Sequence, residues 1–327
     1  MYTDEFIRQI KEGLYQLLPS WGVNPAAEID LLNISENATF LARNTGLDQD
    51  LVFRVYRPGY HDLQEIESEL LWIEAIRKDT RVKTPSIIPL RDGKLVGEIK
   101  QENVILYVVA FEFVDGDSPS EGADLVTHFY NLGVITARLH KHARVWCLPP
   151  SFKRKTWDFE MTLGSVKIWG DYRAAPGLTH EGTNLLERTV EVLRKLLEPL
   201  SQPENFGLIH ADLRLTNLLV NDDGIYVIDF DDCGFSWFLY DFAAAASFIE
   251  HKPYLPDLQA AWVEGYRTEL PLTDVQVAQI PVFVMLRRIL LTAWIASHSE
   301  TPTARELGES YTSGTLELAE RFLQCYA

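Results

Sequence analysis

The sequence predicts an α+β protein in which the strands and most of the helices lie in different parts of the chain. Three short runs rich in β-branched and aromatic residues, at 29–34, 38–43 and 51–56, follow one another early in the chain. After about residue 124 the chain is dominated by apolar residues at helical spacing, apart from short strands between 207 and 228. Strands and helices are therefore segregated and do not alternate, which argues against a parallel βαβ sheet.

The composition is that of a folded chain with at least one large core. Of the 327 residues, 46% are hydrophobic, enough to bury one large or two moderate cores. The net charge of −17 is spread along the chain and repels the phosphates of nucleic acids and anionic lipids. We therefore expect no nucleic-acid partner and no membrane association. The charge would tolerate a cationic acceptor, although solubility alone also accounts for it.

Targeting signals are not evident, and we expect a cytoplasmic protein. The three cysteines form neither a CxxC pair nor a disulfide framework, which is typical of a reducing compartment. The N-terminal segment lacks the basic and apolar regions of a signal peptide. Arg287 and Arg288 interrupt the most apolar stretch, residues 280–296, and make it too short and too charged to span a bilayer. The oligomeric state cannot be read from these features.

The remaining elements follow from periodicity and from chain breakers. Apolar residues at helical spacing predict helices at 3–18, 61–78, 124–146, 183–200 and from about 238 onward. The long apolar strand 104–114 ends at an Asp-Gly-Asp segment, and Pro119 follows. We therefore predict two lobes, residues 1–114 and residues 115–327.

Residues 208–235, which read LIHADLRLTNLLVNDDGIYVIDFDDCGF, contain the sharpest chemical pattern. An apolar strand leads Asp212 into a loop, and Asn217 follows where the next apolar run begins. The turn at residues 221–224 predicts a hairpin that returns Asp229 to the neighbourhood of Asn217. An amide oxygen beside a carboxylate suits Mg²⁺, which takes substrate phosphates as further ligands. Asp212 can accept a proton from an attacking hydroxyl, so the pattern predicts phosphoryl transfer.

The same segment resembles kinase sequences. H-x-D-x-x-x-x-N followed by D-F-x is similar to the kinase catalytic and metal loops. The forms H-A-D and D-F-D-D resemble the aminoglycoside phosphotransferase and choline kinase superfamily, which includes type II homoserine kinases and stress-response kinases. This resemblance implies a kinase that uses ATP and Mg²⁺. It also implies a protein-kinase-like two-lobed fold with a nucleotide-binding first lobe and a catalytic, acceptor-binding second lobe.

The resemblance implies a role for each residue of the motif. Asp212 is the catalytic base, Asn217 and Asp229 hold the metal, and His210 shapes the catalytic loop. Tyr240-Asp241-Phe242-Ala243 resembles a segment of the superfamily in which the aspartate braces that loop through backbone amides. We therefore expect Asp241 to give structural support and not to react.

The first lobe offers candidates for nucleotide binding. Arg54 stands on the third strand, where the V-A-I-K lysine of kinases would be, and would bind phosphate as a fork. The next helix offers several acids to orient it, and by resemblance we prefer Glu69 to Glu65. By the same resemblance, the backbone at Glu112 and Val114, at the end of the long strand, would contact the adenine edge.

The turn between the first two strands departs from a glycine-rich phosphate loop. It reads Asn33-Ile34-Ser35-Glu36-Asn37-Ala38-Thr39 and contains no glycine. Ser35 and Asn37 tolerate a tight turn and can offer donors to phosphate. A GxxxxGK[ST] loop is absent from the sequence, so nucleotide binding by that route is excluded.

The acceptor is expected to be a small, cationic molecule that bears a hydroxyl group. Candidate contacts are Asp231, Asp232, Trp157 and Tyr240, because acids and aromatic faces together hold ammonium groups. An amino alcohol, an amino acid or an aminoglycoside would fit, and Asp231 has the alternative of an additional metal ligand. Two other functions stay open at this point: a Ser/Thr protein kinase of the stress-response type, and a non-catalytic kinase-like binding module.

Overall fold

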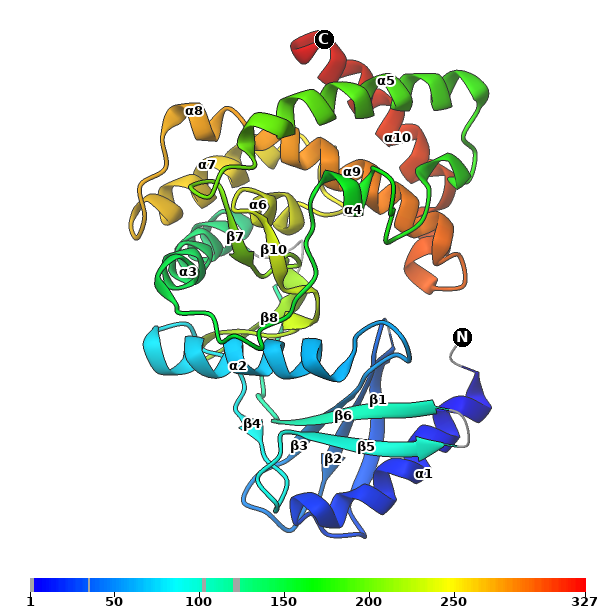
Figure 1. The fold of residues 1–327 in the computed structure, drawn as a ribbon, viewed down its shortest axis with the longest axis vertical. Coiled ribbons are helices and arrows are strands. Elements are labelled where there is room, and N and C mark those ends of the chain that lie inside the picture. The colour runs from blue at the N-terminus through cyan, green and yellow to red at the C-terminus, as the bar shows by residue number, and fades with distance from the viewer. Residues whose placement is uncertain (1–2, 35, 102–103, 120–123) are drawn as a thin grey trace. The chain divides into compact units, whose positions relative to one another are not determined.

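The computed structural model describes residues 3–34, 36–101, 104–119 and 124–327. These residues form two compact units (Figure 1). Unit 1 contains Met1–Asp117, Leu148–Lys153 and Leu219–Asp231, and unit 2 contains Ser118–Cys147, Arg154–Leu218 and Asp232–Ala327. The first lobe was predicted to end at residue 114, and the contacts also assign two later segments to it.

Unit 1 is an antiparallel sheet covered by helix α1. The strand order is β1-β2-β3-β6-β4, and β5 pairs with β6. The elements are α1 (Asp4–Trp21), β1 (Glu28–Ile34), β2 (Ala38–Arg43), β3 (Leu51–Val55), α2 (Leu63–Asp79), β4 (Ile87–Ile88), β5 (Val96–Gln101) and β6 (Val104–Glu112). The apolar face of α1, which includes Ile10, Leu14 and Leu18, packs on strand residues such as Phe40 and Phe53. This packing makes the sheet a rigid support for Arg54 on β3.

Helix α2 begins at a capping box. The Asp62 carboxylate accepts a hydrogen bond from the Glu65 backbone N–H at 2.9 Å, and the Glu65 carboxylate accepts one from the Asp62 backbone N–H at 3.0 Å. Such reciprocal bonds fix the first turn of a helix. The start of α2, and with it the direction of its acidic side chains, is therefore set by local sequence.

Unit 2 is mostly helical. Its helices are α3 (Leu125–Val145), α4 (Phe159–Thr162), α5 (His180–Leu197), α6 (Tyr240–Ala245), α7 (Leu255–Arg267), α8 (Asp274–Val277), α9 (Ile280–Ser297) and α10 (Pro302–Tyr326). Helices α3 and α7 approach closely, because a Cβ atom on Gly133 would lie 2.0 Å from the Trp262 carbonyl oxygen. Only glycine permits this separation.

Short strands flank the loops that matter for function. Strand β7 (Phe206–Ile209) pairs antiparallel with β10 (Gly234–Trp237), and β8 (Leu218–Asn221) forms the predicted hairpin with β9 (Gly224–Val227). Strand β10 was not predicted, because G-F-S-W is short and has no clear alternation. Strand β10 begins immediately after the D-F-D-D-C segment, so its pairing with β7 fixes the chain where that segment ends.

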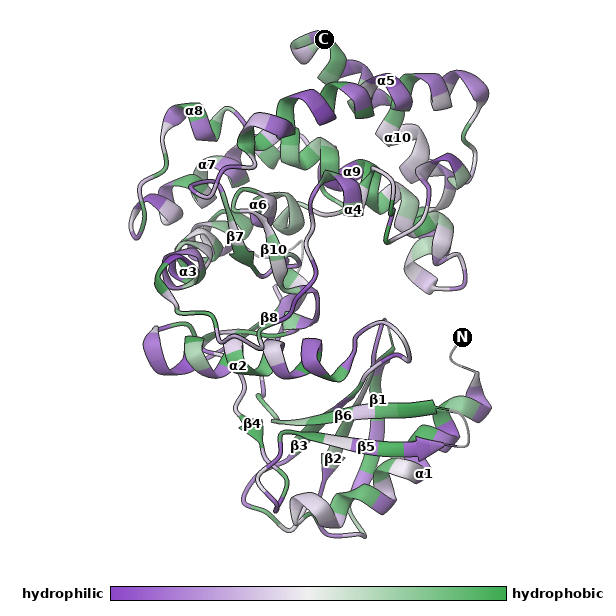
Figure 2. Cartoon of the chain, viewed as in Figure 1, coloured by the Kyte–Doolittle hydropathy of each residue, from purple (hydrophilic) through white to green (hydrophobic). Residues whose placement is uncertain are grey.

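Helix α9 is apolar over most of its length, as Figure 2 shows. By length and composition the segment Asp274–Ser297 could cross a membrane, contrary to the expectation from its two arginines. However, 72% of the apolar stretch within this segment is buried inside the protein. Core helices of other proteins have a similar length and composition. Its apolar composition is therefore accounted for by packing.

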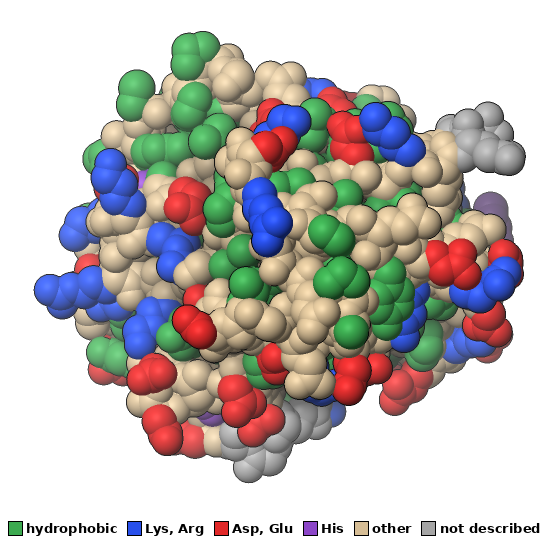
Figure 3. Space-filling view, turned by 90° about the horizontal axis from the view of Figure 1, so that it is seen from below, with side chains coloured by type: hydrophobic (Ala, Val, Ile, Leu, Met, Phe, Trp, Pro, Cys, Tyr) green, Lys and Arg blue, Asp and Glu red, His purple; other side chains and the backbone are tan. Residues whose placement is uncertain are grey.

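The acidic excess does not form a single patch on the face that Figure 3 shows. Acidic and basic side chains are interspersed there with scattered apolar ones. Mixed charge of this kind is normal for a protein surface.

Candidate active site

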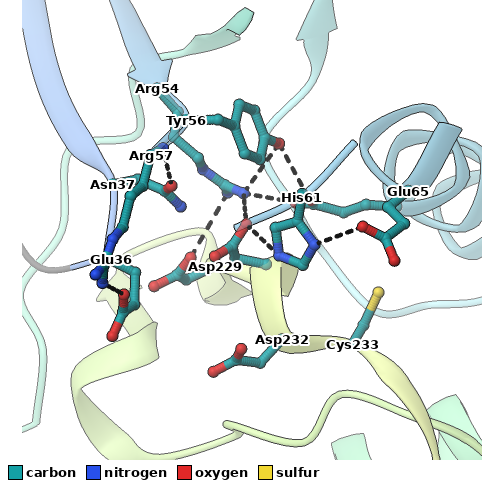
Figure 4. Close-up of polar contacts among 12 residues, drawn as sticks. Glu36, Asn37, Arg54, Tyr56, Arg57, His61, Glu65, Asp229, Asp232 and Cys233 are labelled. Atoms are coloured by element: carbon teal, nitrogen blue, oxygen red, sulfur yellow. Dashed lines mark hydrogen bonds and ion pairs between the residues drawn. The ribbon is translucent and has the colours of Figure 1, made fainter. Parts of the chain in front are cut away.

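Arg54 and Glu69 form a buried ion pair in unit 1. The Arg54 Nη1 atom donates to Glu69 Oε1 at 2.6 Å, and the Tyr56 hydroxyl donates to Glu69 Oε2 at 2.9 Å. Burial lowers the pKa of Arg54, but the neighbouring acids, above all Glu69, hold it well above its usual range. Arg54 is therefore a permanent cation with a fixed orientation (Figure 4).

The other side of the Arg54 guanidinium faces the acids of D-F-D-D. Its Nη2 atom lies 3.8 Å from Asp229 Oδ1, and its Nη1 atom lies 4.0 Å from Asp231 Oδ1. Asp229 is 42% exposed in its side chain and has a backbone φ of +63°. Asp229 can thus present an oxygen to a ligand while it neighbours a cation.

His61 is a member of this cluster that the sequence did not reveal. Its Nε2 atom lies 3.3 Å from Asp231 Oδ1, and its Nδ1 atom lies 3.5 Å from Glu65 Oε2 (Figure 4). A hydrogen bond from His61 lowers the pKa of Glu65 to about 2, against the opposing effect of burial. Glu65 is thus engaged by His61 and by the helix cap, while Arg54 is paired with Glu69. The signal in the sequence was weak: one histidine just before a helix cap.

The glycine-free turn is braced by Arg57. The Asn37 side-chain oxygen accepts a hydrogen bond from the Arg57 backbone N–H at 3.1 Å, and Glu36 forms an ion pair with the Arg57 side chain at 2.5 Å. These bonds hold the ends of the turn where a glycine-rich loop would depend on backbone freedom. Ser35, predicted to contact phosphate, lies outside the described residues.

At Glu112, one of the two positions predicted to contact adenine, the backbone N–H is engaged within the protein. The Glu112 backbone N–H donates to Ser86 O at 2.9 Å, and its carboxylate accepts from the Ser86 N–H at 2.9 Å. Val114 follows, two residues after the end of β6. The Glu112 N–H therefore serves the fold of unit 1, and the Glu112 backbone carbonyl and the backbone of Val114 stay candidates for adenine contact.

In unit 2, Asp241 braces the loop that follows β7. Its carboxylate accepts hydrogen bonds from the backbone N–H groups of Ala211 at 2.7 Å and His210 at 3.3 Å. Ala211 has a φ of +67°, a left-handed conformation that costs energy for a residue with a side chain. Asp241, on α6, thereby holds the loop in the shape that presents Asp212.

Asp241 also belongs to a buried hydrogen-bond chain. His140 Nε2 lies 3.0 Å from Asp241 Oδ2, and His140 Nδ1 lies 3.0 Å from the Tyr266 hydroxyl. The partners imply that Nε2 carries the proton and that Nδ1 accepts from Tyr266. Burial lowers the pKa of His140, and Asp241 only partly offsets this effect.

Acidification should therefore destabilise the protein through His140. Because the pKa of His140 in the folded protein lies below its usual value of 6.5, its contribution to stability is fully present above pH 6.5 and is lost as the pH falls from there through the folded pKa. His140→Gln can keep both hydrogen bonds without titrating, so its melting temperature should fall less between pH 7.5 and 5.5 than that of the wild type. The exposed His180→Gln serves as control and should keep the wild-type slope. Identical slopes for His140→Gln and the wild type would contradict this role.

Asp212 is held on both carboxylate oxygens. The Asn217 amide donates to Asp212 Oδ2 at 2.9 Å and to its backbone carbonyl at 2.8 Å. Arg214 Nε lies 3.1 Å from Oδ2, and Arg287 Nη2 lies 2.7 Å from Oδ1. Burial raises the pKa of Asp212, but Arg214, Arg287 and His210 together bring it below its usual value. Asp212 is therefore a carboxylate at neutral pH.

His210 lies at the end of β7 and is fully buried. Its Nδ1 atom lies 3.4 Å from the Asp212 backbone N–H, which donates to it. This contact ties the ring to the same loop that Asp241 braces. The placement suits the loop-shaping role that the resemblance implies.

The predicted acceptor residues differ in their contacts. Trp157 is buried and donates to the Asp232 carbonyl at 2.8 Å, and the Tyr240 hydroxyl accepts from Arg287 at 3.1 Å. Asp231 neighbours His61 in unit 1, whereas Asp232 belongs to unit 2. Trp157 and Tyr240 thus contact other residues of the protein, and their contact with an acceptor stays a prediction.

Comparison with known proteins identifies the family. The sequence profile of the phosphotransferase enzyme family matches residues 31–274. The structure is similar to that of a microcompartment-associated aminopropanol kinase, at 44% identity and a TM-score of 0.89, over 95% of this chain and 97% of the other. Spectinomycin phosphotransferase shares the fold, at 16% identity and a TM-score of 0.63, over 96% of this chain and 98% of that one.

Amicoumacin kinase from Bacillus subtilis (strain 168) is 27% identical over 215 residues, which are 62% of this chain. The matched region spans only 61% of that relative. The structural matches confirm the predicted kinase-like α+β fold. Because the family profile covers more than half of the sequence, the chain belongs to the phosphotransferase enzyme family, as its H-A-D and D-F-D-D motifs predicted.

Proposed function

We propose that this protein is an ATP-dependent, Mg²⁺-assisted kinase that phosphorylates the hydroxyl group of a small amino alcohol. The proposal rests chiefly on the 44% identity, over 95% of the chain, to a microcompartment-associated aminopropanol kinase. The expectation of a cationic acceptor points the same way, because an amino alcohol carries an ammonium group at neutral pH. An acceptor of the amino acid or aminoglycoside type is the nearest alternative.

Asp212 is the group that takes the proton from the acceptor hydroxyl. It is ionised, and two arginines and Asn217 fix its position. A carboxylate has about four lone-pair sites, so these bonds leave room for one more donor. Phosphoryl transfer depends mainly on positioning and on stabilisation of charge, which this loop supplies.

Arg54 would bind the α- and β-phosphates of the nucleotide. Its fixed pairing with Glu69 orients the planar fork, which matches phosphate oxygens better than a lysine would. Asn37, Ser35 and Val114 are proposed as further nucleotide contacts.

The residues present suit Mg²⁺. Among the described residues no group of three or more His, Cys, Asp or Glu side chains could hold a metal. Mg²⁺ needs few protein ligands when a nucleotide supplies phosphates. The Asn217 amide nitrogen bonds to Asp212, which turns its oxygen to the opposite side, and Asp229 keeps an exposed carboxylate. We assign these two oxygens to the metal, which would neutralise phosphate charge during transfer.

Asp232 is the strongest candidate for the acceptor ammonium. It belongs to unit 2, as Asp212 does, and its charge acts on both Tyr240 and Arg287. Asp231 is held by His61 and by the neighbouring Arg54, so its role is closer to nucleotide or metal binding.

A panel of acceptors tests this function. ADP release should be measured with ATP and Mg²⁺ in the presence of 1-amino-2-propanol, ethanolamine, choline, homoserine, an aminoglycoside and a generic protein substrate. The amino alcohols should give the highest kcat/KM. Turnover confined to the protein substrate would favour a stress-response type of protein kinase. A chain that neither turns over nor shows an Mg²⁺-dependent thermal shift with ATP would be a non-catalytic module.

A further inference from the structure

Helix α9 places an arginine directly against Asp212. Arg287 lies beyond residues 31–274, the part of the chain that the family profile matches, so the family's motifs do not specify it. Its Nη2 atom is 2.7 Å from Asp212 Oδ1, although the two residues are 75 positions apart in the sequence. Both residues belong to unit 2.

The Arg287 side chain is enclosed by groups that fix its direction. It is 3% exposed and donates to the Ser247 hydroxyl at 3.1 Å, to the Tyr240 hydroxyl at 3.1 Å and to the Ala211 carbonyl at 3.4 Å. Its guanidinium also lies over the Trp169 ring, 5.0 Å from the centroid. A buried cation is costly unless it is paired and hydrogen-bonded, so this position is closely specified.

Two other arginines show what is particular to Arg287. Arg214 contacts the other oxygen of Asp212 but is 34% exposed. Arg288, the next residue of α9, is equally buried but bonds to Glu250 at 2.8 Å, Tyr311 O at 2.9 Å and Thr315 at 2.8 Å. Arg288 therefore joins structural elements of unit 2, whereas Arg287 is the one of these three arginines that is both buried and in contact with Asp212.

We propose that Arg287 is a positioning residue for Asp212: from its buried, fixed position it binds Oδ1 and holds the carboxylate in the orientation that receives the acceptor hydroxyl. This inference rests on the proposed role of Asp212 as the base. The same contacts assign the Trp169 and Tyr240 rings to Arg287, so an acceptor ammonium would be held by Asp232 and not by these aromatic faces.

Kinetics of Arg287→Ala and Arg287→Lys test the proposal in the full chain with ATP, Mg²⁺ and 1-amino-2-propanol. A carboxylate displaced by about 1 Å costs on the order of 100-fold in rate, so kcat should fall by about that factor in Arg287→Ala. KM for ATP should stay within about twofold. Added guanidinium, at concentrations far below those that denature, should restore part of the kcat lost in Arg287→Ala. Arg288→Lys is the matched control and should lower the melting temperature without this loss of kcat.

Two results would overturn the proposal: wild-type kcat in a folded Arg287 variant, or a loss of kcat that guanidinium does not relieve and that Arg288→Lys reproduces.

A thermal double-mutant cycle of Asp212→Asn and Arg287→Gln gives a readout that needs no turnover. The two shifts in melting temperature should be non-additive, because each change removes the other's partner. Additive shifts would overturn the pairing. If the wild type turns over no acceptor, the proposed function fails, and the cycle still decides whether Arg287 positions Asp212.

Discussion

Replacing Asp212 by asparagine should lower kcat for phosphoryl transfer by about 10²–10⁴-fold, the range typical of a lost general base. Asparagine keeps the size of the side chain but cannot take a proton from the acceptor hydroxyl. The change also leaves Arg287, which is almost fully buried, without its anionic partner. Breaking a buried pair on one side is destabilising, so the melting temperature of Asp212→Asn should fall as well.

Nucleotide binding separates loss of chemistry from loss of fold in this variant. Isothermal titration with an ATP analogue and Mg²⁺ should give a Kd close to that of the wild type, because Arg54 and Glu69 are untouched. Transfer at the wild-type rate in Asp212→Asn would show that another group takes the proton.

Replacing Asp229 by asparagine should weaken Mg²⁺-dependent ATP binding by more than about tenfold, since even residues that only support a metal ligand have effects of 10- to 100-fold. Asparagine is the informative substitution because Asp229 has a φ of +63°, a conformation that asparagine adopts at a lower energetic cost than alanine. Asparagine also removes the attraction between the Asp229 carboxylate and the Arg54 guanidinium, whose nearest atoms lie 3.8 Å apart, and so leaves the cation to the phosphates. Binding of metal-free ATP should therefore stay the same or strengthen.

A thermal-shift titration with Mg²⁺ at a fixed concentration of ATP measures this effect. The midpoint should move to higher Mg²⁺ in Asp229→Asn, whereas Asp223→Asn, in the turn of the β8–β9 hairpin, should keep the wild-type midpoint. An unchanged midpoint in Asp229→Asn would remove this residue from the metal site.

Local patterns in the sequence predicted the site residues that lie close to one another along the chain. Asp212 and Asn217 lie in one loop, and their spacing alone placed both on it. The pairing of Arg54 with Glu69 spans a strand and a helix, and its prediction depended on a resemblance to known kinases. The α+β segregation followed from periodicity, because long helices and paired strands have distinct repeats.

Residues whose role depends on distant contacts could not be predicted. Arg287 was seen only as an interruption in an apolar stretch, and its partner lies 75 residues away. Buried arginines need partners, so two of them in the most apolar helix were a signal that buried acids lay nearby, but not which acids. The local signal for His61 was weak, a single histidine before a helix cap, because its contact with Asp231 joins distant parts of the chain. Such roles depend on burial and on contacts between distant residues, and neither of these leaves a repeating pattern in the sequence.

The identity of the phosphorylated product tests the central proposal most directly. ³¹P nuclear magnetic resonance should follow the wild-type protein with ATP, Mg²⁺ and 1-amino-2-propanol, with Asp212→Asn in parallel. We predict a new phosphomonoester signal on the secondary alcohol, matched by an equal amount of ADP, and a greatly reduced signal in the variant. ATP that is not consumed above the rate without protein, or phosphate that appears only as inorganic phosphate, would contradict a kinase acting on an amino alcohol.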